Sequence, residues 1–255
     1  MSETRATNGV PLVRMENIVK RFGTITALDG VDFEVAHQQV HALLGDNGAG
    51  KSTLIKILTG VYPPTSGQIY IEGQPVRFSS PRDARMMGIE TVYQDLALVD
   101  TMSITRNFFL GREIVRRLGP LPWLDMRTMN ERTRSALHDI GIEIRSPTEK
   151  VGSLSGGERQ SIAIGRAVHF GAKLLILDEP TSALSVAETR KVLTYIENAK
   201  ARGLSVIFIT HNVRHVYMVA DAYTILRHGK KVGTYFRGEL SENDIADLIT
   251  GERER

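Results

Sequence analysis

One short stretch of the chain has the residue types and the spacing needed to hold a phosphate group. Residues 45–52 read Gly-Asp-Asn-Gly-Ala-Gly-Lys-Ser and fit the pattern G-x-x-x-x-G-K-[ST] at every specified position. The glycines allow a tight loop of inward-pointing amide N–H groups, Lys51 can reach the β- and γ-phosphates, and the Ser52 hydroxyl can ligate Mg²⁺. The flanks, an expected strand at 40–44 and an expected helix at 52–59, argue against a chance glycine-rich turn. We therefore expect this stretch to bind a nucleotide through Gly45, Asp46, Asn47, Gly48, Ala49, Gly50, Lys51, Ser52 and Thr53.

A pair of carboxylates follows a second apolar run. Residues 174–177 are Leu-Leu-Ile-Leu, and Asp178 and Glu179 come directly after them. In an open parallel sheet, ligands sit beyond the carboxyl ends of the strands. We expect Asp178 to hold Mg²⁺ through its water shell and Glu179 to orient or deprotonate an attacking water. The alternative is that both are acidic helix-cap residues after a core strand, and the phosphate loop upstream favours the catalytic interpretation.

Residues 154–160, Leu-Ser-Gly-Gly-Glu-Arg-Gln, separate the possible classes of protein. Ser155 and Glu158 have the spacing of a capping box, which is a purely structural explanation. It does not explain the adjacent Gly156 and Gly157, because glycines weaken a helix start. Glycines at a helix N-terminus expose amide N–H groups that an anion can approach closely.

The elements that position these residues alternate between strands and helices, which predicts an α/β protein with βαβ units and a largely parallel sheet. Expected strands lie at residues 12–19, 27–35, 40–44, 68–72, 75–78, 89–93, 174–177 and 204–209, with two more between 223 and 236 that meet near Gly229. Expected helices lie at residues 52–59, 81–87, 104–110, 126–140, 154–170, 186–202 and 241–249.

From residue 95 onward the alternation is interrupted by helices, which a loop containing Gly119, Pro120 and Pro122 separates. We interpret residues 95 to about 165 as a helical subdomain inserted into one domain of residues 11–251. Residues 1–10 are expected to form a loose polar tail.

Composition narrows the function classes. The 255 residues carry a net charge of +3, which gives no case for nucleic acid as the main partner. The absence of cysteine excludes disulfides and thiol chemistry and suits a cytosolic protein. Residues 1–10 do not resemble a signal peptide, and no apolar run approaches the ~20 residues that span a bilayer. Work at a membrane would therefore require partner chains.

The phosphate loop, the Leu-Ser-Gly-Gly-x-x-Gln segment and the Asp178-Glu179 pair together resemble the ATP-binding-cassette ATPases, from about residue 12 to residue 251. The resemblance implies a phosphate-loop NTPase fold with a mostly parallel core sheet, an antiparallel β subdomain and an inserted helical subdomain. It also implies roles for three residues that would otherwise be ordinary surface or core residues. Phe22 would stack on adenine, Gln94 would lie near Mg²⁺ and the attacking water, and His211 would contact the γ-phosphate.

The same resemblance implies a head-to-tail homodimer with two ATP molecules at the interface. Ser155, Gly156 and Gly157 would then contact ATP held by the partner's Lys51. Ser185 departs from the family pattern, since many relatives carry Asp there in a loop that runs between the two nucleotide sites. The sequence alone does not show which hydrogen bonds the loop at Ser185 makes.

Residues 94–98, 103–104, 107–113, 170–173 and 210–213 are similar to the ATPase subunits of bacterial monosaccharide importers, and the single cassette is most like the fructose-importer type. This implies ATP and Mg²⁺ as cofactors, membrane permease subunits as partners, a periplasmic sugar-binding protein as an indirect partner, and a peripheral location on the cytoplasmic face of the inner membrane. We expect the helical subdomain to dock onto the permease. The apolar residues near its start could serve docking or the subdomain core, and these are Leu96, Leu98, Phe108 and Phe109.

Other classes fit the sequence less well. A cassette ATPase that acts on another solute, on nucleic acid or on ribosomes is the main alternative, although the chain has no segment long enough for a coiled coil. A GTP switch would need an Asn-Lys-x-Asp guanine motif, which the sequence lacks. A purely structural module would leave Lys51, Asp178, Glu179 and His211 unexplained.

Overall fold

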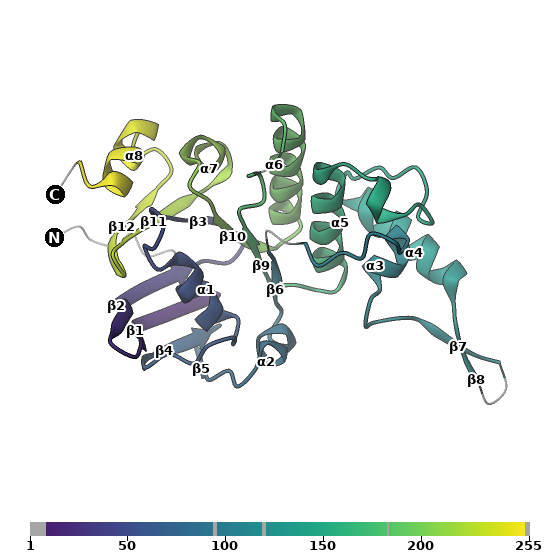
Figure 1. The fold of residues 1–255 in the computed structure, drawn as a ribbon, viewed down its shortest axis with the longest axis horizontal. Helices are drawn as coiled ribbons and strands as arrows, with labels where there is room; N and C mark the ends of the chain where they lie inside the picture. The colour runs from purple at the N-terminus through teal and green to yellow at the C-terminus, as the bar shows by residue number, and fades with distance from the viewer. Residues whose placement is uncertain (1–8, 94–95, 119–120, 183, 253–255) are drawn as a thin grey trace. The chain divides into compact units, whose positions relative to one another are not determined.

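The computed structural model describes residues 9–93, 96–118, 121–182 and 184–252. Its contacts divide the chain into two compact units, which are described separately below (Figure 1). The first unit contains residues 1–91, 172–179 and 200–255, and the second contains residues 92–171 and 180–199. No helix among the described residues has the length and apolar character needed to cross a membrane.

A largely parallel sheet forms the centre of the first unit, as the alternating pattern predicts. In the part of the chain that the structure describes, it has six strands in the order β12-β11-β3-β10-β9-β6. β11, β3, β10 and β9 are parallel neighbours, and β12 pairs antiparallel with β11 at one edge. The strands are β3 (Val40–Leu44), β6 (Ile89–Val92), β9 (Leu174–Asp178), β10 (Ser205–Ile209), β11 (Ala222–Arg227) and β12 (Lys230–Phe236).

The central strands are apolar throughout because they are buried on both faces. All five residues of β3 and all five of β10 are buried, and so are the first four of β9. Continuous apolar runs of this kind are typical of parallel strands covered by helices. This burial fixes the positions of the loops that follow the strands.

A second sheet in the first unit is antiparallel, with the order β2-β1-β4-β5. Helix α1 (Lys51–Leu58) lies against it (Figure 1), and its Leu54, Ile55, Ile57 and Leu58 are buried in a core shared with β1 and β2. The four strands are β1 (Val13–Phe22), β2 (Ile25–Val35), β4 (Ser66–Ile71) and β5 (Gln74–Val76).

Among the described residues, three further helices belong to the first unit, and one of them was not predicted. α2 (Pro81–Met86) and α8 (Glu242–Thr250) begin at capping boxes formed by Ser80 and Ser241. α7 (Val213–Val219) was missed because its residues are mostly β-branched or aromatic, which favours a strand. The local signal for α7 was its cap, since the side chain of Asn212 accepts a hydrogen bond from the backbone N–H of His215.

The second unit is built mainly from helices. These are α3 (Ile104–Phe108), α4 (Met126–Asp139), α5 (Gly156–His169) and most of α6 (Val186–Ala201), with a 3₁₀ turn at Val151–Ser153. α4 and α5 pack closely, since a Cβ added at Gly165 of α5 would collide with the side chain of Leu137 of α4. The predicted insertion, residues 95–165, lies within the segment 92–171, and no sequence pattern indicated that α6 joins the same unit.

Of the residues predicted to form a loop, Gly119 and Pro120 lie outside the described residues, and for Pro122 the prediction is wrong because it lies in a strand. β7 (Val115–Leu118) and β8 (Leu121–Leu124) pair antiparallel and form a hairpin that projects from the second unit (Figure 1). Pro122 lies in β8, where a two-stranded hairpin leaves one edge of each strand without a neighbour in the sheet, so a missing N–H is tolerated.

Phe108 and Phe109 belong to the core of the second unit. Both side chains are buried, and their rings form a cluster with His169 and Phe170 at centroid distances of 4.9 to 6.0 Å. They are therefore packing residues rather than docking residues. The buried Asn107 beside them fixes the preceding turn, because its side chain hydrogen-bonds both the N–H and the C=O of Val99.

Candidate functional site

The phosphate loop joins β3 to α1 in the first unit, and its glycines are required by both conformation and space. Gly45, Gly48 and Gly50 have φ angles of 147°, 79° and 103°, a region that L side chains rarely adopt. A Cβ at Gly50 would lie 2.7 Å from Leu28 Cδ2, and one at Gly45 would collide with the carbonyl oxygen of Leu226. The loop therefore packs directly on neighbouring elements and keeps its concave shape.

The Lys51 ammonium lies against this loop. Its Nζ donates to the carbonyl oxygens of Gly45, at 2.7 Å, and Asp46, at 3.0 Å. Burial lowers the pKa of Lys51, and the negative charges of Glu179, Asp46 and Asp178 act against that shift. Asp178, predicted to hold Mg²⁺, and Glu179, predicted to activate water, therefore lie within electrostatic reach of the loop lysine.

The other loop residues present different faces. Ala49 is buried, while Asp46, Asn47 and Gly48 are exposed, and the N–H of Asn47 donates to Asp46 Oδ1 at 2.6 Å. In the first turn of α1, Ser52 is exposed and Thr53 is half-buried. Asp46 and Asn47 are therefore open to solvent, whereas the Lys51 side chain turns back onto the loop.

Asp178 and Glu179 lie at the same edge of the sheet as the phosphate loop, because β9 and β3 both pair in parallel with β10 and end at the same level. Ile209 of β10 pairs with Asp178 of β9 on one side and with Leu43 of β3 on the other. Burial and the charge of Glu179 raise the pKa of Asp178, and the charge of Lys51 opposes this shift. The predicted convergence of loop and carboxylates is present in the structure.

Glu179 is held firmly at this edge. Its Oε2 accepts a hydrogen bond from the Thr210 hydroxyl at 3.0 Å, and its Oε1 accepts one from the backbone N–H of His211 at 3.0 Å. The Nδ1 of His211 lies 2.8 Å from the same Oε1, which favours the tautomer with the proton on Nδ1. The Glu179 side chain is 18% exposed and that of His211 is 69% exposed, so the pair lies at the rim of the site.

Phe22 lies at the end of β1 with its ring exposed. The Tyr62 ring packs edge-on against it at a centroid distance of 5.4 Å, and the Lys20 ammonium lies 5.0 Å from its centroid. The Tyr62 ring stands nearly perpendicular to the Phe22 ring, at 76°, so the surface offered to a purine is the exposed part of the Phe22 ring itself, with the Lys20 cation near its face.

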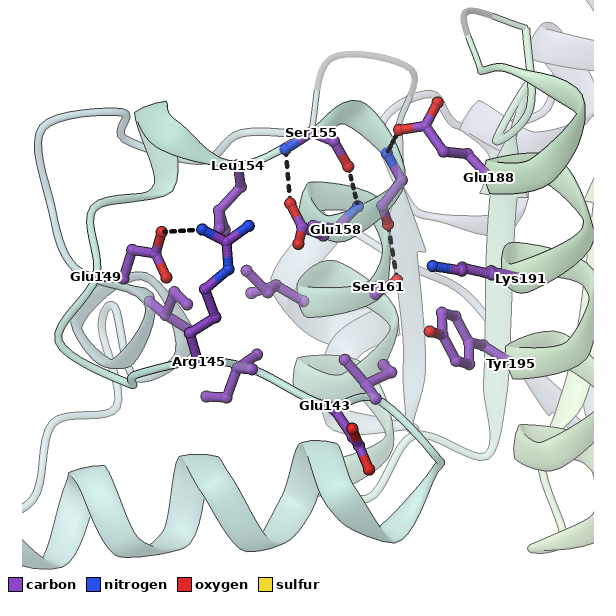
Figure 2. A pocket seen from close by; sticks show the side chains of 15 residues that line it. Glu143, Arg145, Glu149, Leu154, Ser155, Glu158, Ser161, Glu188, Lys191 and Tyr195 are labelled. Atoms are coloured by element: carbon purple, nitrogen blue, oxygen red, sulfur yellow. Dashed lines mark hydrogen bonds and ion pairs between the residues drawn. The ribbon is translucent and has the colours of Figure 1, made fainter.

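The Leu-Ser-Gly-Gly segment lies in the second unit and forms the start of α5 (Figure 2). The capping box is real, because the N–H of Ser155 donates to Glu158 Oε2 at 2.8 Å and the N–H of Glu158 donates to Ser155 Oγ at 3.3 Å. The capping box does not explain why residues 156 and 157 are glycines, but the space around them does. A Cβ at Gly156 would lie 2.9 Å from Leu184 Cδ2, and one at Gly157 would lie 3.0 Å from Glu188 Cβ.

Ser185 has a defined role in place of the more common Asp. Its backbone N–H, at 3.1 Å, and its hydroxyl, at 2.8 Å, both donate to Glu188 Oε2, and its Oγ accepts from the N–H of Glu188 at 3.3 Å. Ser185 and Glu188 therefore form a capping box at the start of α6. Gln94, predicted to lie near Mg²⁺ and the attacking water, falls outside the described residues.

Comparison with known proteins places this site in a family. Residues 28–182 match a family described as ABC transporter. The chain is 45% identical, over 94% of each chain, to the xylose/arabinose import ATP-binding protein of Sulfolobus acidocaldarius. It is 43% identical to the fructose import ATP-binding protein of Rhizobium meliloti, over 96% of this chain and 95% of that one. A ribose import ATP-binding protein of Yersinia pestis is 39% identical over 96% of this chain but 47% of its own length.

Solved structures agree. A crystal structure of the ADP conformation of an ATP-binding cassette of an ABC transporter superposes with a TM-score of 0.80 at 26% identity, over 94% of this chain and 95% of that chain. The chain therefore belongs to the ABC transporter family. It is an ATP-binding cassette, the nucleotide-binding ATPase component, and the predicted family and fold class are confirmed.

Sequence reasoning missed three residues that the structure places beside the predicted ones. Thr210 directly precedes His211 and follows the strand expected at residues 204–209, so no local pattern assigned a role to its hydroxyl. Glu188 could have been found, because Ser185-x-x-Glu188 has the spacing of a capping box. Tyr62 carried no local signal, since its contact with Phe22 depends on the pairing of distant strands.

Proposed function

We propose that this cassette is the ATP-hydrolysing subunit of an importer for a monosaccharide, a pentose or a hexose. The observation that carries the proposal is the identity of 43–45%, over nearly the full length of both chains, to subunits named for xylose/arabinose and fructose import. Partner permease subunits would bind and pass the sugar, with a periplasmic sugar-binding protein delivering it. The cassette would then work at the cytoplasmic face of the inner membrane.

The geometry supports a division of roles within the first unit. The loop amides and Lys51 would hold the phosphates, and Phe22 would stack on the adenine. Glu179 would accept a proton from the attacking water, since Thr210 and His211 hold its carboxylate at a fixed place at the rim of the site.

The donor set also fits a magnesium ion. The Ser52 hydroxyl and the Asp178 carboxylate are the hard oxygen ligands that Mg²⁺ prefers, with water and phosphate oxygens as the remaining ligands. When bound, the ion would neutralise charge that develops on the phosphates during hydrolysis. Gln94 would complete this part of the site.

A second copy of the chain would complete the nucleotide site. Each chain carries one phosphate loop and one Leu-Ser-Gly-Gly segment, so we propose that two chains pair head to tail and each segment binds the ATP of the partner. Anion binding by Ser155 and the amide of Gly157 is consistent with their position at the positive end of α5. A solved cassette with a TM-score of 0.72 is described as a dimeric post-hydrolysis state bound to ADP and Pi, and its 22% identity shows likeness of fold.

The proposal is tested by sugar uptake in the source organism. Deletion of the gene should abolish uptake of at least one of xylose, arabinose, fructose and ribose. The unchanged gene should restore that uptake, and Glu179→Gln should not, because the hydrolytic base is lost. Glu197→Gln, which removes an exposed carboxylate of α6, serves as the matched control and should restore uptake. Normal uptake of all four sugars in the deletion strain would contradict the assignment to monosaccharide import.

A further inference from the structure

Glu188 connects two helices of the second unit at the start of the signature segment, defined here as residues 154–160. One carboxylate oxygen, Oε1, accepts a hydrogen bond from the N–H of Gly157 at 3.3 Å, and the other, Oε2, accepts two from Ser185. Figure 2 shows the carboxylate directed from α6 toward the first turn of α5. These bonds, with a further one to Ser155, lower the pKa of Glu188 to about 2, so the side chain carries its negative charge.

The groups that Glu188 engages are the ones assigned above to a nucleotide. The amide of Gly157 and the hydroxyl of Ser155 are the donors that would meet a phosphate of the ATP held by a second copy. A carboxylate on the same donors is therefore an internal anion in the place where an external one would bind. An incoming phosphate oxygen would have to take the Gly157 N–H from Glu188, and the two negative charges would repel each other.

Local packing brings the carboxylate to this position. A Cβ at Gly157 would lie 3.0 Å from Glu188 Cβ and 3.1 Å from its Cγ, so glycine at 157 is what allows the close approach. Ser161 Oγ donates to the carbonyl oxygen of Gly157 at 2.7 Å, so the carbonyl group of Gly157 is held as well as its N–H group. The capping box with Ser185 then orients the Glu188 side chain.

A cavity beside Glu188 offers its carboxylate a second position. The cavity has a volume of about 310 Å³, and its lining includes Glu188, Lys191 and Arg145. Lys191 lies three residues after Glu188, on the same face of α6 (Figure 2). A rotation of the Glu188 side chain into this cavity would bring its charge toward Lys191 and release the Gly157 amide. The other cation of the lining, Arg145, pairs with Glu149 at 3.9 Å, and Glu143 and Glu158 also line the cavity.

We propose that Glu188 controls access to the signature segment, by holding the Gly157 amide and the Ser155 hydroxyl until the phosphate of a second copy's ATP displaces it. The proposal rests on the function proposed above, in which the signature segment binds the ATP of a second chain. It assigns Glu188 as a residue that opposes premature pairing and sets how much ATP-dependent stabilisation the closed pair requires.

The test measures ATP-dependent pairing in a Glu179→Gln background, where ATP should stay intact. The variant Glu188→Gln keeps the shape and an oxygen that can accept from Gly157, but removes the charge. Two unit charges about 4 Å apart in water repel enough to weaken binding about fivefold, so over two sites the dimer dissociation constant should fall about 25-fold. The control Glu143→Gln removes an exposed charge from the lining of the same cavity and should change the constant less than about twofold.

Sedimentation or light scattering with saturating Mg-ATP distinguishes the outcomes. If the background protein binds ATP and pairs, but Glu188→Gln pairs no more tightly, the inference about Glu188 is overturned while the proposed function stands. If the background protein binds ATP and stays monomeric at high concentration, the composite site itself is wrong.

A second measurement tests the hydrogen bond between Gly157 and Glu188 in the monomer, without dimer formation. In nucleotide-free protein, Glu188→Ala should speed hydrogen exchange at the Gly157 amide severalfold, because the amide loses its acceptor. The exchange of the Arg159 amide, which donates to the carbonyl oxygen of Ser155 within α5, should stay the same and shows that the helix is intact. An unchanged rate at Gly157 would overturn the proposal.

Discussion

Replacing Thr210 by valine would separate the positioning of Glu179 from the chemistry that Glu179 performs. Thr210 is buried, with 1% of its surface exposed, and valine has nearly its shape. The change removes the hydroxyl that donates to Glu179 Oε2 at 3.0 Å and that accepts from the N–H of Asn212 at 3.1 Å. The carboxylate would keep its contacts with His211 and lose its restraint on the other oxygen.

The size of the effect follows from the type of bond. A hydrogen bond to a charged group contributes about 1.5–3 kcal/mol. Because Glu179 is partly solvated at the rim, we take the lower half of that range, about 1.5–2 kcal/mol. If the aligned carboxylate is needed in the transition state, kcat for ATP hydrolysis should fall about 10- to 30-fold. The KM for ATP should change less than about twofold, because Thr210 is not among the residues assigned to nucleotide binding.

Steady-state hydrolysis of Mg-ATP by the purified variant provides the assay. Thr194→Val is the matched control, since Thr194 is exposed on α6 and its hydroxyl bonds a carbonyl of its own helix. Thr210→Ser restores the hydroxyl and should recover most of the activity. A folded Thr210→Val protein with unchanged kcat would refute the argument that this bond positions the base.

Four further outcomes are expected. Lys51→Ala should abolish hydrolysis and leave the circular dichroism spectrum unchanged, because it removes a cation from the loop and no core packing. Glu179→Gln should be monomeric without nucleotide and dimeric with Mg-ATP by size exclusion, and adding Ser155→Arg should prevent the shift, since a bulky side chain enters the phosphate site. A cysteine placed at Val99 should cross-link to the permease, because that exposed residue lies at the start of the helical segment. Burial lowers the pKa of His41 to about 3, so the unfolded chain takes up its proton first as pH falls below 6.5. The free energy of unfolding in urea should therefore drop by about 1.4 kcal/mol per pH unit from this residue between pH 6.5 and 3, and His41→Gln should lack that contribution.

Each of these outcomes has a clear opposite. Near-normal hydrolysis by folded Lys51→Ala protein would contradict the phosphate-loop assignment. A Glu179→Gln protein that binds ATP without pairing would argue for a monomeric ATPase. Permease capture from the opposite face of the second unit, and none from Val99, would contradict the docking direction. An equal pH slope in His41→Gln would mean that the pKa of His41 is not lowered in the folded protein.

The sequence predicted the parts of the fold that depend on local patterns. The helix expected at residues 126–140 is found at Met126–Asp139, with Asp125 as its cap, because apolar spacing and a capping side chain are both readable locally. The β7–β8 hairpin was not readable in this way, since each strand has four residues and the segment contains glycine and two prolines. Short strands of this kind depend on pairing with each other.

The site was predictable to a similar extent. The motif residues Lys51 and Glu179 were found from spacing, and the parallel register of β3, β10 and β9 explains why they converge. The bond from Thr210 to Glu179 and the bond from Gly157 to Glu188 were not predictable, because each joins residues 31 positions apart and depends on the final packing.

The projecting β7–β8 hairpin has a practical consequence for spectroscopy. Trp123 of β8 is the single tryptophan of the sequence, and 59% of its surface is exposed. Intrinsic tryptophan fluorescence therefore reports the surroundings of this hairpin and no other part of the chain. A permease or lipid surface that covers the hairpin would shift the emission of Trp123 to shorter wavelength and shield it from a soluble quencher. The native protein thus carries a built-in optical probe for whether that side of the cassette is in contact with the rest of the transporter.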